Sequence, residues 1–335
     1  MKPRHSLGAL LAAGCLSLVI SGSARAEVTA KFAVTLNEQS HQGQGVARFV
    51  ELVAKKSNGN IVIKPYYNAA LGNDVAVTSA LQGGTIEFVV PQTTTLTGMI
   101  KEFEILDFPF LFDTDQEAYA VLDGPIGKKL LETLPAKGLV GLGYWENGFF
   151  NITNSKHPIT RLEDFQGLKL RAIQAKISQA TIKALGASPV TLAVPELYTA
   201  LETRTVDGQG TPNAVIAALK LFEVQKYLST TRHAYGAFIP LVSKKFWDKL
   251  SEADHKILLD SAAEARTYQR QVARDQAKSA LTTMTAKGLQ VNEIAPAERE
   301  RMRAAVKPVW DEFNASVGAE TVQAVSTELK KLRGK

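Results

Sequence analysis

Arg171 is the residue whose type and position point most directly to binding chemistry. It ends the short strand-like run Leu168-Lys169-Leu170-Arg171, and a helical pattern begins near Ile177. In α/β proteins, groups at such strand ends often contact ligands. A guanidinium is permanently charged, and its planar fork of N–H donors matches a carboxylate. We therefore expect Arg171 to bind the carboxylate of a small organic acid; from position alone, a surface ion pair with Glu163 or Asp164 remains an alternative.

Two other polar segments could complete such a site. Thr211 precedes Pro212, which is typical of an N-cap and first-turn pair. A helix N-terminus presents unpaired N–H groups and can bind an anion or a polar oxygen beside Arg171. Gln92 and Thr93 stand in a hydroxyl-rich loop that follows a predicted strand over 86–90.

Signals of catalysis or of a metal site are missing from the sequence. The five histidines, at positions 5, 41, 157, 233 and 255, have no metal-ligand spacing. There is no G-x-S-x-G elbow and no Walker loop, and no two carboxylates can be paired as acid and base. We expect a protein that is not an enzyme and that has no cofactor and no metal. The alternative, a secreted hydrolase or lyase, requires an acid–base pair beside Arg171.

The first 26 residues have the features of an export signal. Lys2 and Arg4 form a basic start, the apolar run over 7–20 is too short to span a bilayer, and Ala24-Arg25-Ala26 is a cleavage site. We expect cleavage after Ala26 and a location in the periplasm. A lipoprotein signal ending at Cys15 is the alternative. Because Cys15 is the only cysteine, the mature chain would have no disulfide and no thiolate chemistry.

Composition excludes several classes of partner. The chain has 335 residues, of which 45% are hydrophobic and 21% charged, so it can form about two globular domains. Loss of Lys2, Arg4 and Arg25 lowers the formal net charge from +6 to +3. The remaining Lys and Arg residues are interspersed with acids, so we expect no nucleic-acid partner. No apolar run after residue 26 is long enough to cross a membrane.

The order of predicted elements indicates an α/β fold with two lobes. Strands over 31–36, 61–66 and 86–90 alternate with helices, which favours a parallel sheet. A helix is expected around 116–134, and 145–150 is expected to be an extended hinge segment between the lobes. The alternation then repeats from Arg171 onward.

A long helix is expected to connect the lobes. Ser251 and Asp254 resemble a capping box, and apolar residues recur at three-to-four spacing until Gly288, over roughly 57 Å. The helical pattern from Pro296 to the end should cover the second lobe. We place lobe I at 27–147 plus 236–277 and lobe II at 148–235 plus 278–335.

Several stretches resemble one family, the solute-binding proteins of tripartite ATP-independent periplasmic (TRAP) transporters, of the dicarboxylate-binding (DctP) type. They occur in the family's order over most of the mature chain. They are Leu71-Gly72-Asn73-Asp74, Gly84-Thr85-Ile86-Glu87, Pro109-Phe110-Leu111-Phe112, Gly167-Leu168-Lys169-Leu170-Arg171, Ala184-Leu185-Gly186-Ala187, 196–201, Val206-Asp207-Gly208-Gln209 and 222–228.

The resemblance implies a two-lobed periplasmic binding protein fold with crossing strands and a long helix. It implies a ligand cleft between the lobes and delivery of the ligand to a TRAP membrane permease driven by an ion gradient. It also implies that Arg171 pairs with the ligand carboxylate. A ligand-sensing subunit of a membrane receptor would use the same cleft, so this alternative stays open, and we expect a monomer.

Two departures from the family pattern bear on the ligand. Gly148-Phe149-Phe150 stands where members often have G-F-R, and Thr211 replaces the asparagine of D-G-Q-E-N-P. Loss of a cation at Phe150 favours a monocarboxylate with an apolar body over a C4-dicarboxylate. The full set of expected ligand-binding residues is Arg171, Thr211, Asn213, Phe150, Gln92, Thr93, Gln39, Trp145, Val194 and Phe238.

Overall fold

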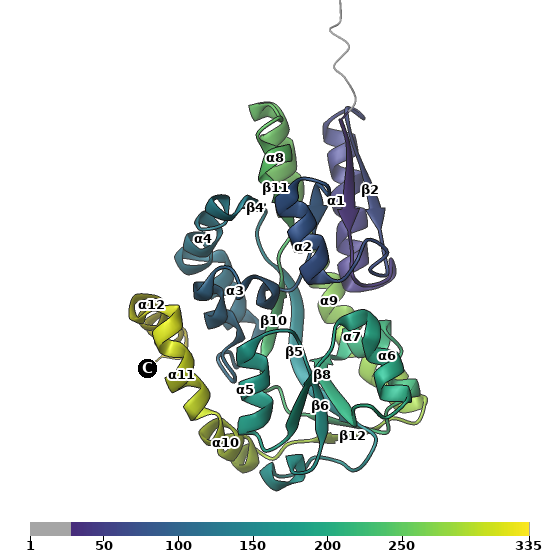
Figure 1. Cartoon of the computed structure of the whole chain (residues 1–335), viewed down its shortest axis with the longest axis vertical. Helices are drawn as coiled ribbons and strands as arrows, with labels where there is room; N and C mark the ends of the chain where they lie inside the picture. Colours follow the sequence, from purple (N-terminus) through teal and green to yellow (C-terminus); the bar gives the residue numbers. More distant parts are fainter. Residues whose placement is uncertain (1–27, 335) are drawn as a thin grey trace, which may run out of the picture.

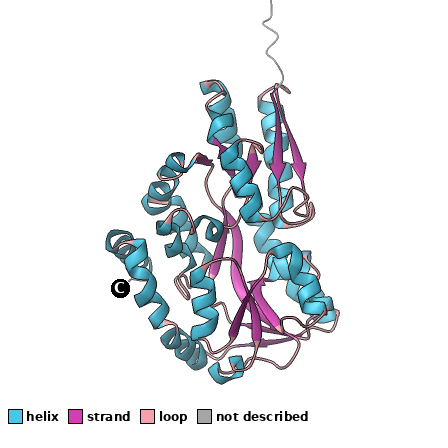
Figure 2. Cartoon of the chain, viewed as in Figure 1, coloured by secondary structure: helices cyan, strands magenta, loops and turns pink. Residues whose placement is uncertain are grey.

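The computed structural model describes residues 28–334, which form two lobes, each built on a β-sheet (Figure 1). Helices cover the sheets, and the longest strand runs through the middle of the molecule (Figure 2). The predicted signal peptide, its cleavage after Ala26 and the lipoprotein alternative at Cys15 fall outside the described residues. No helix within 28–334 is long and apolar enough to cross a membrane.

The sheet of the first lobe has five strands in the order β2-β1-β3-β11-β4. β1 pairs in parallel with both β2 and β3, as the β–α alternation predicted, whereas β11 is antiparallel. Pro65 lies in β2, where the missing N–H is tolerated because this strand is at the sheet edge. The strands are β1 (Val28–Ala33), β2 (Ile61–Tyr66), β3 (Phe88–Val89), β4 (Leu139–Gly141) and β11 (Leu241–Ser243). The helices are α1 (His41–Lys56), α2 (Asp74–Gly83), α3 (Asp115–Asp123), α4 (Pro125–Glu132) and α8 (Lys244–Trp247).

The second lobe has a mixed sheet in the order β12-β9-β5-β8-β6-β7, with β10 paired to β5. β6 lies parallel to β7 and β8, and β5 is antiparallel to β8. The strands are β5 (Trp145–Asn154), β6 (Lys169–Ala172), β7 (Ser188–Thr191), β8 (Gly208–Pro212), β9 (Tyr227–Thr230), β10 (Tyr235–Phe238) and β12 (Gln290–Glu293). The helices are α5 (Lys176–Ala184), α6 (Val194–Glu202) and α7 (Asn213–Ala218).

Two structures cross between the lobes. The first is the ribbon of β5 and β10, in which Tyr235 pairs with Phe149 and Phe238 pairs with Trp145. The second is α9 (Glu252–Ala286), whose capping box at Ser251 is present as predicted. Leu258 of α9 lies in the apolar core of the first lobe and Met284 in that of the second, so the expected long helix spanning both lobes is confirmed.

The prediction of a single helix around 116–134 is wrong, because this segment forms two helices. It divides into α3 and α4 at Gly124 and Pro125. Pro125 has no N–H to donate to the preceding turn, and it occupies the first turn of α4, where none is needed.

The C-terminal segment is helical from Pro296 onward, as predicted, and it is divided into three helices. α10 (Pro296–Ala305), α11 (Lys307–Val317) and α12 (Ala319–Leu332) run along the side of the molecule, and α12 lies beside α3 and α4 (Figure 1). Arg333 forms a two-bonded ion pair with Glu117 of α3, at 2.9 and 2.7 Å. α12 therefore contacts helices that precede the crossing strands. The lobe boundaries, including the assignment of 278–335 to lobe II, stay a proposal.

The aromatic segment over 108–112 lies in the apolar core that continues between the lobes. It follows the 3₁₀ helix η2 (Lys101–Asp107), and Phe108 contacts Trp310 of α11 while Phe112 contacts Tyr235 of the crossing ribbon. The same core includes Leu170 of β6. This packing holds Asp107, at the end of η2, against the second lobe.

Candidate functional site

Arg171 lies near the carboxyl end of β6 and is buried, with 4% of its surface exposed. Its Nε donates to the carbonyl of Leu192 at 2.9 Å, and its two Nη atoms have no hydrogen-bond partner among residues 28–334. The alternative of a surface ion pair is excluded, because Glu163 pairs with Arg301 and Asp164 with Arg161. A buried guanidinium with free N–H donors can bind an anion.

The charge of Arg171 is only partly balanced by its surroundings. Burial lowers its pKa to about 10, and the carboxylates of Asp74 and Glu196 oppose that shift. The side chain therefore keeps its proton at neutral pH. Burial also raises the pKa of Asp74, against a hydrogen bond from Thr35 and the charge of Arg171. Because no ion pair within 28–334 joins Arg171 to an acid at contact distance, an incoming carboxylate would supply the missing counter-charge.

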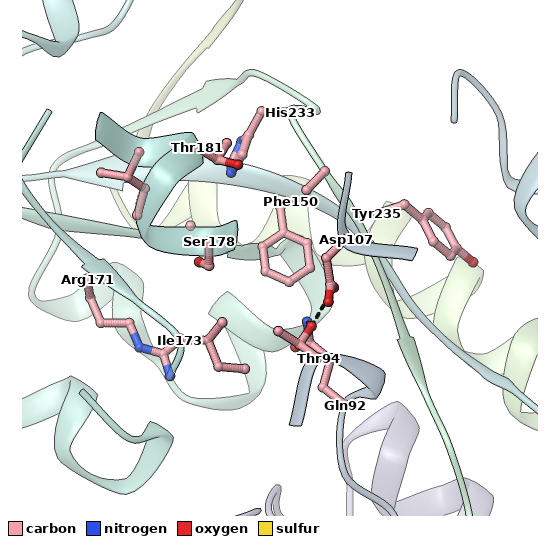
Figure 3. Close-up of a pocket in the computed structure, with 13 residues that line it drawn as sticks. Gln92, Thr94, Asp107, Phe150, Arg171, Ile173, Ser178, Thr181, His233 and Tyr235 are labelled. Carbon is pink, nitrogen blue, oxygen red and sulfur yellow. Dashed lines mark hydrogen bonds between the residues drawn. The ribbon is translucent and has the colours of Figure 1, made fainter. Parts of the chain in front are cut away.

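One cavity beside Arg171 lies between the lobes (Figure 3). Its empty volume, which includes space that opens to solvent, is about 530 Å³. The loop after β3 and the 3₁₀ helices η1 (Thr93–Leu96) and η2 line it from the first lobe, and β5, β6, α5 and β8 line it from the second. The lining residues are Gln92, Thr94, Asp107, Phe150, Arg171, Ile173, Ser178, Thr181, Ile182, Gly210, His233, Ala234 and Tyr235.

A second, smaller cavity shares Arg171 and Ile173 with the first. Its empty volume, again including space that opens to solvent, is about 370 Å³. The first lobe contributes residues around the start of α2, and the second lobe contributes the segment that leads into α6. The remaining lining residues are Thr35, Asn73, Asp74, Val75, Thr95, Gln174, Leu192, Ala193, Val194 and Pro195. Arg171 thus stands at the junction of two cavities, each lined from both lobes.

A chain of hydrogen bonds runs along the first-lobe wall. Asn147 donates to Gln92 at 3.3 Å, Gln92 donates to Thr94 at 2.8 Å, and Thr94 donates to Asp107 Oδ1 at 2.5 Å. Burial raises the pKa of Asp107 to about 7, with a further contribution from Glu104 and opposition from the Thr94 hydrogen bond. This wall can accept and donate hydrogen bonds, which an apolar wall cannot.

Several buried polar atoms in and around this region have no hydrogen-bond partner among the described residues. Buried polar groups are normally paired, so such atoms indicate places where a ligand or water completes the bonding. They include both ring nitrogens of His41, whose ring packs against Phe238 at an interplanar angle of 42°, and Thr93 Oγ1, Asn147 Oδ1, Thr211 Oγ1 and Tyr235 OH.

The structure brings part of the predicted set together. Arg171, Gln92 and Phe150 line the first cavity, and Val194 lines the second. Thr211 follows Gly210, a lining residue of β8. The prediction that Thr211 caps a helix is wrong: it belongs to β8, and α7 begins at Asn213 with no side-chain cap.

The other predicted residues line neither cavity. Asn213 accepts a hydrogen bond from Asn151 at 2.9 Å, and Thr93 is buried beside Gln92. Trp145 packs in the first-lobe core with its Nε1 unpaired, and Phe238 lies in the same core. Gln39 is exposed and holds Gln276 of α9 through its backbone carbonyl.

The hydrolase or lyase alternative requires a hydrogen-bonded acid–base pair in the cavity. Asp107 and His233 are the candidates for such a pair, and they do not form one. Asp107 and His233 line the same cavity, but no hydrogen bond joins them; His233 Nδ1 bonds to the Thr231 hydroxyl at 2.8 Å. Burial alone lowers the pKa of His233 to about 4, with no carboxylate acting on it. Within residues 28–334, no group of three or more His, Cys, Asp and Glu side chains could hold a metal ion.

The sequence interpretation missed Asp107, Thr94, Ser178 and His233 of the first cavity and Asp74 of the second. Asp74 belongs to one of the stretches that carried the family resemblance, so a signal for it was present. Asp107 had only its place before the aromatic segment, which indicated core packing. His233 gave no local signal.

Comparisons with known proteins agree on one family. The family described as "Bacterial extracellular solute-binding protein, family 7" matches residues 32–316. The chain is 36% identical to the C4-dicarboxylate-binding periplasmic protein DctP of Rhodobacter capsulatus, over 97% of this chain and 98% of that one. The crystal structure of the sugar acid binding protein DctPAm from Advenella mimigardefordensis, in complex with galactonate, is similar with a TM-score of 0.90 and 41% identity, covering 91% of this chain and 99% of that chain. A TRAP periplasmic solute-binding protein from Polaromonas, bound to D-erythronate, is similar with a TM-score of 0.87 and 38% identity, over 89% and 98% of the two chains.

Proposed function

The chain belongs to family 7 of the bacterial extracellular solute-binding proteins, the TRAP type, and from this premise we propose that it captures a hydroxylated monocarboxylate in the periplasm for a TRAP permease. Members of this family bind small organic acids and work with TRAP membrane permeases. What we propose beyond the family is that the ligand of this chain has a single carboxylate and a hydroxylated body.

The observation that carries the proposal is the state of Arg171. Its guanidinium is buried, charged at neutral pH and unbonded at both Nη atoms, and it stands where two inter-lobe cavities meet. Leu192 holds the Nε atom, which fixes the plane of the fork. A carboxylate can then accept from both Nη atoms, with the orientation already set before the ligand arrives.

One carboxylate suits this site better than two. Phe150 presents a ring at the first cavity, and His233 is neutral at physiological pH because burial lowers its pKa to about 4. Arg171 is therefore the one permanent cation among the residues that line either cavity. A second ligand carboxylate would be desolvated there without a cation to pair with.

A hydroxylated ligand body replaces the apolar body expected from the sequence. Phe150 and Ile173 give the first cavity an apolar side, but Gln92, Thr94 and Asp107 form a polar wall. Thr93 and Thr211 add unpaired buried hydroxyls nearby. The relatives in complex with galactonate and D-erythronate support this chemistry, since both ligands are hydroxylated monocarboxylates.

Ligand binding would couple to closure of the lobes. Each cavity takes residues from both lobes, so a ligand that fills them stabilises the closed arrangement more than an open one. The crossing ribbon of β5 and β10 and the helix α9 are the connections about which such a motion would occur.

We further propose that the chain is exported, cleaved after Ala26 and works as a monomer without catalysing a reaction. The test of function is a thermal-unfolding screen of the mature chain against galactonate, D-erythronate, succinate and acetate. A ligand that binds only the folded state raises the melting temperature by an amount that grows with the logarithm of its concentration relative to Kd. We expect a clear rise with at least one aldonate. If no carboxylate raises the melting temperature at millimolar concentration, the proposal fails.

A further inference from the structure

Asp107 is a half-buried acid that the proposed binding of a carboxylate by Arg171 does not use. It is the last residue of η2, and Oδ1 accepts the Thr94 hydroxyl at 2.5 Å. Oδ2 is buried and has no hydrogen-bond partner within residues 28–334. The side chain lines the same cavity as Arg171. One oxygen is thus fixed, and the other is available to a ligand.

The surroundings of Asp107 contain no compensating cation. Glu104, one turn earlier in η2, is the charged residue that acts on it, and its effect is repulsive. His233, across the cavity, is neutral. In Figure 3, Ile173 and Phe150 lie between Arg171, on the left, and Asp107, near the centre of the view. The cavity is therefore lined by one permanent cation and by an acid that has no cation beside it.

We propose that Asp107 determines which ligand charge this site accepts, by taking a hydrogen bond from a ligand hydroxyl and by repelling a second ligand carboxylate. The inference rests on the proposed function, because it assumes that a carboxylate binds at Arg171. Arg171 would bind the carboxylate, and Asp107 would select hydroxy monocarboxylates over dicarboxylates.

The physical basis is the difference between a hydroxyl and a carboxylate at the far end of the ligand. A hydroxyl can donate to Oδ2 and satisfy its bonding. A carboxylate has no proton to donate, and two like charges in a water-poor cavity cannot both stay ionised without a large energetic penalty. Binding a dicarboxylate would thus require a proton at Asp107 or at the ligand. Because burial raises the pKa of Asp107 to about 7, that proton is readily supplied at pH 6, and the rejection of a second carboxylate should be strongest above pH 8. Phe150 contributes by occupying part of the cavity wall without offering a cation.

D-Erythronate and succinate make a matched pair for the test, because both have four carbons and one carboxylate that can reach Arg171. Their affinities are measured by calorimetric titration for the wild type and for Asp107→Asn. Asparagine keeps the shape and the acceptor for Thr94 but removes the charge. We expect the wild type to favour D-erythronate over succinate at least tenfold at pH 8.5, where Asp107, with its pKa raised to about 7, is ionised. Asp107→Asn should reduce that preference at least tenfold, mainly through tighter succinate binding.

Two further variants separate charge from shape and folding. Asp107→Glu keeps the charge and should still reject succinate, whereas Asp107→Ser removes it and should behave as the asparagine variant does. Asp311→Asn removes an exposed carboxylate that pairs with Lys307 and should leave the preference unchanged. Circular dichroism confirms that each variant is folded.

The outcomes separate this inference from the proposed function. If the wild type binds D-erythronate and the neutral variants keep its preference, the role of Asp107 is overturned while the function stands. A wild type that binds succinate as well as D-erythronate also overturns it. If the wild type binds neither ligand nor any other carboxylate, the proposed function fails, and the inference falls with it.

Discussion

Gln269 holds the backbone of Glu146 at both of its hydrogen-bonding groups. The Glu146 N–H donates to Gln269 Oε1 at 2.8 Å, and Gln269 Nε2 donates to the Glu146 carbonyl at 2.7 Å. Gln269 lies in the middle of α9 and is fully buried. Glu146 lies in β5, where it pairs with Ala237 of the antiparallel strand β10. A helix side chain thus takes the place of a neighbouring strand at the point where the chain crosses between the lobes.

Replacing Gln269 by leucine should destabilise the protein. The substitution leaves a buried N–H and a buried C=O of Glu146 without partners, and each unpaired group costs about 1–3 kcal/mol. We expect the free energy of unfolding to fall by ~2–6 kcal/mol in urea denaturation. Gln271→Leu, at an exposed position of the same helix, should change it little. Equal effects of the two substitutions would show that this clamp has no special role.

Gly45 should tolerate no side chain. A Cβ at this position of α1 would lie 2.6 Å from Gln269 Cγ and 2.8 Å from Trp145 Cζ3. Gly45→Ala should therefore destabilise the fold by about 1–3 kcal/mol through overpacking, although alanine favours helices. Gly98→Ala meets nothing within 4 Å and serves as the control in the same thermal-unfolding measurement. A stabilised Gly45→Ala protein would contradict the close approach of α1, α9 and β5.

The carboxyl of Glu146 should make stability depend on pH. It is 4% exposed and accepts a hydrogen bond from Tyr119, and burial raises its pKa to about 7. Asp115 adds to this rise, whereas Arg270 and Arg274 oppose it.

A raised pKa means that the folded state holds this proton more tightly than the unfolded state. The protonated Glu146 carboxyl therefore stabilises the folded state. This stabilisation is fully present below about pH 4.5, the ordinary pKa of glutamate, and is lost as the pH rises through about 7. Glu146→Gln has no proton to lose, so its stability relative to the wild type should increase between pH 5 and pH 8, by up to ~3 kcal/mol. Urea denaturation of both proteins at the two pH values measures the difference. A difference independent of pH would contradict the buried, protonated state.

The sequence predicted those parts of the molecule that depend on neighbouring residues. The strand and helix around Arg171 follow from a short apolar run and the helical spacing after it. The long helix α9 follows from the Ser251 capping box and a sustained apolar period. The break between α3 and α4 was also marked in the sequence, by Gly124 and Pro125. The prediction nevertheless joined the two helices, because the residues on both sides have helical spacing.

The rest depends on contacts between residues far apart in the chain. Asp107 and Arg171 meet at one cavity only because the core around Phe108 and Phe112 holds η2 against the second lobe. The docking of α12 on the first lobe depends on Arg333 and Glu117, which are 216 residues apart. Local propensity carries no information on such pairings, so neither the polar wall of the cavity nor the path of the last helix could be predicted.

The central claim is that Arg171 binds a ligand carboxylate, and calorimetric titration of wild type and Arg171→Ala with the aldonate that gives the largest thermal shift tests it most directly. Loss of the guanidinium leaves a buried carboxylate without its charged partner, so affinity should fall at least a hundredfold, or about 2.7 kcal/mol. Arg171→Lys keeps the charge but not the fork and should lose affinity to an intermediate extent. Arg48→Ala, a residue that lines neither cavity, should bind as the wild type does. If a folded Arg171→Ala protein binds the aldonate within threefold of the wild type, the account is contradicted.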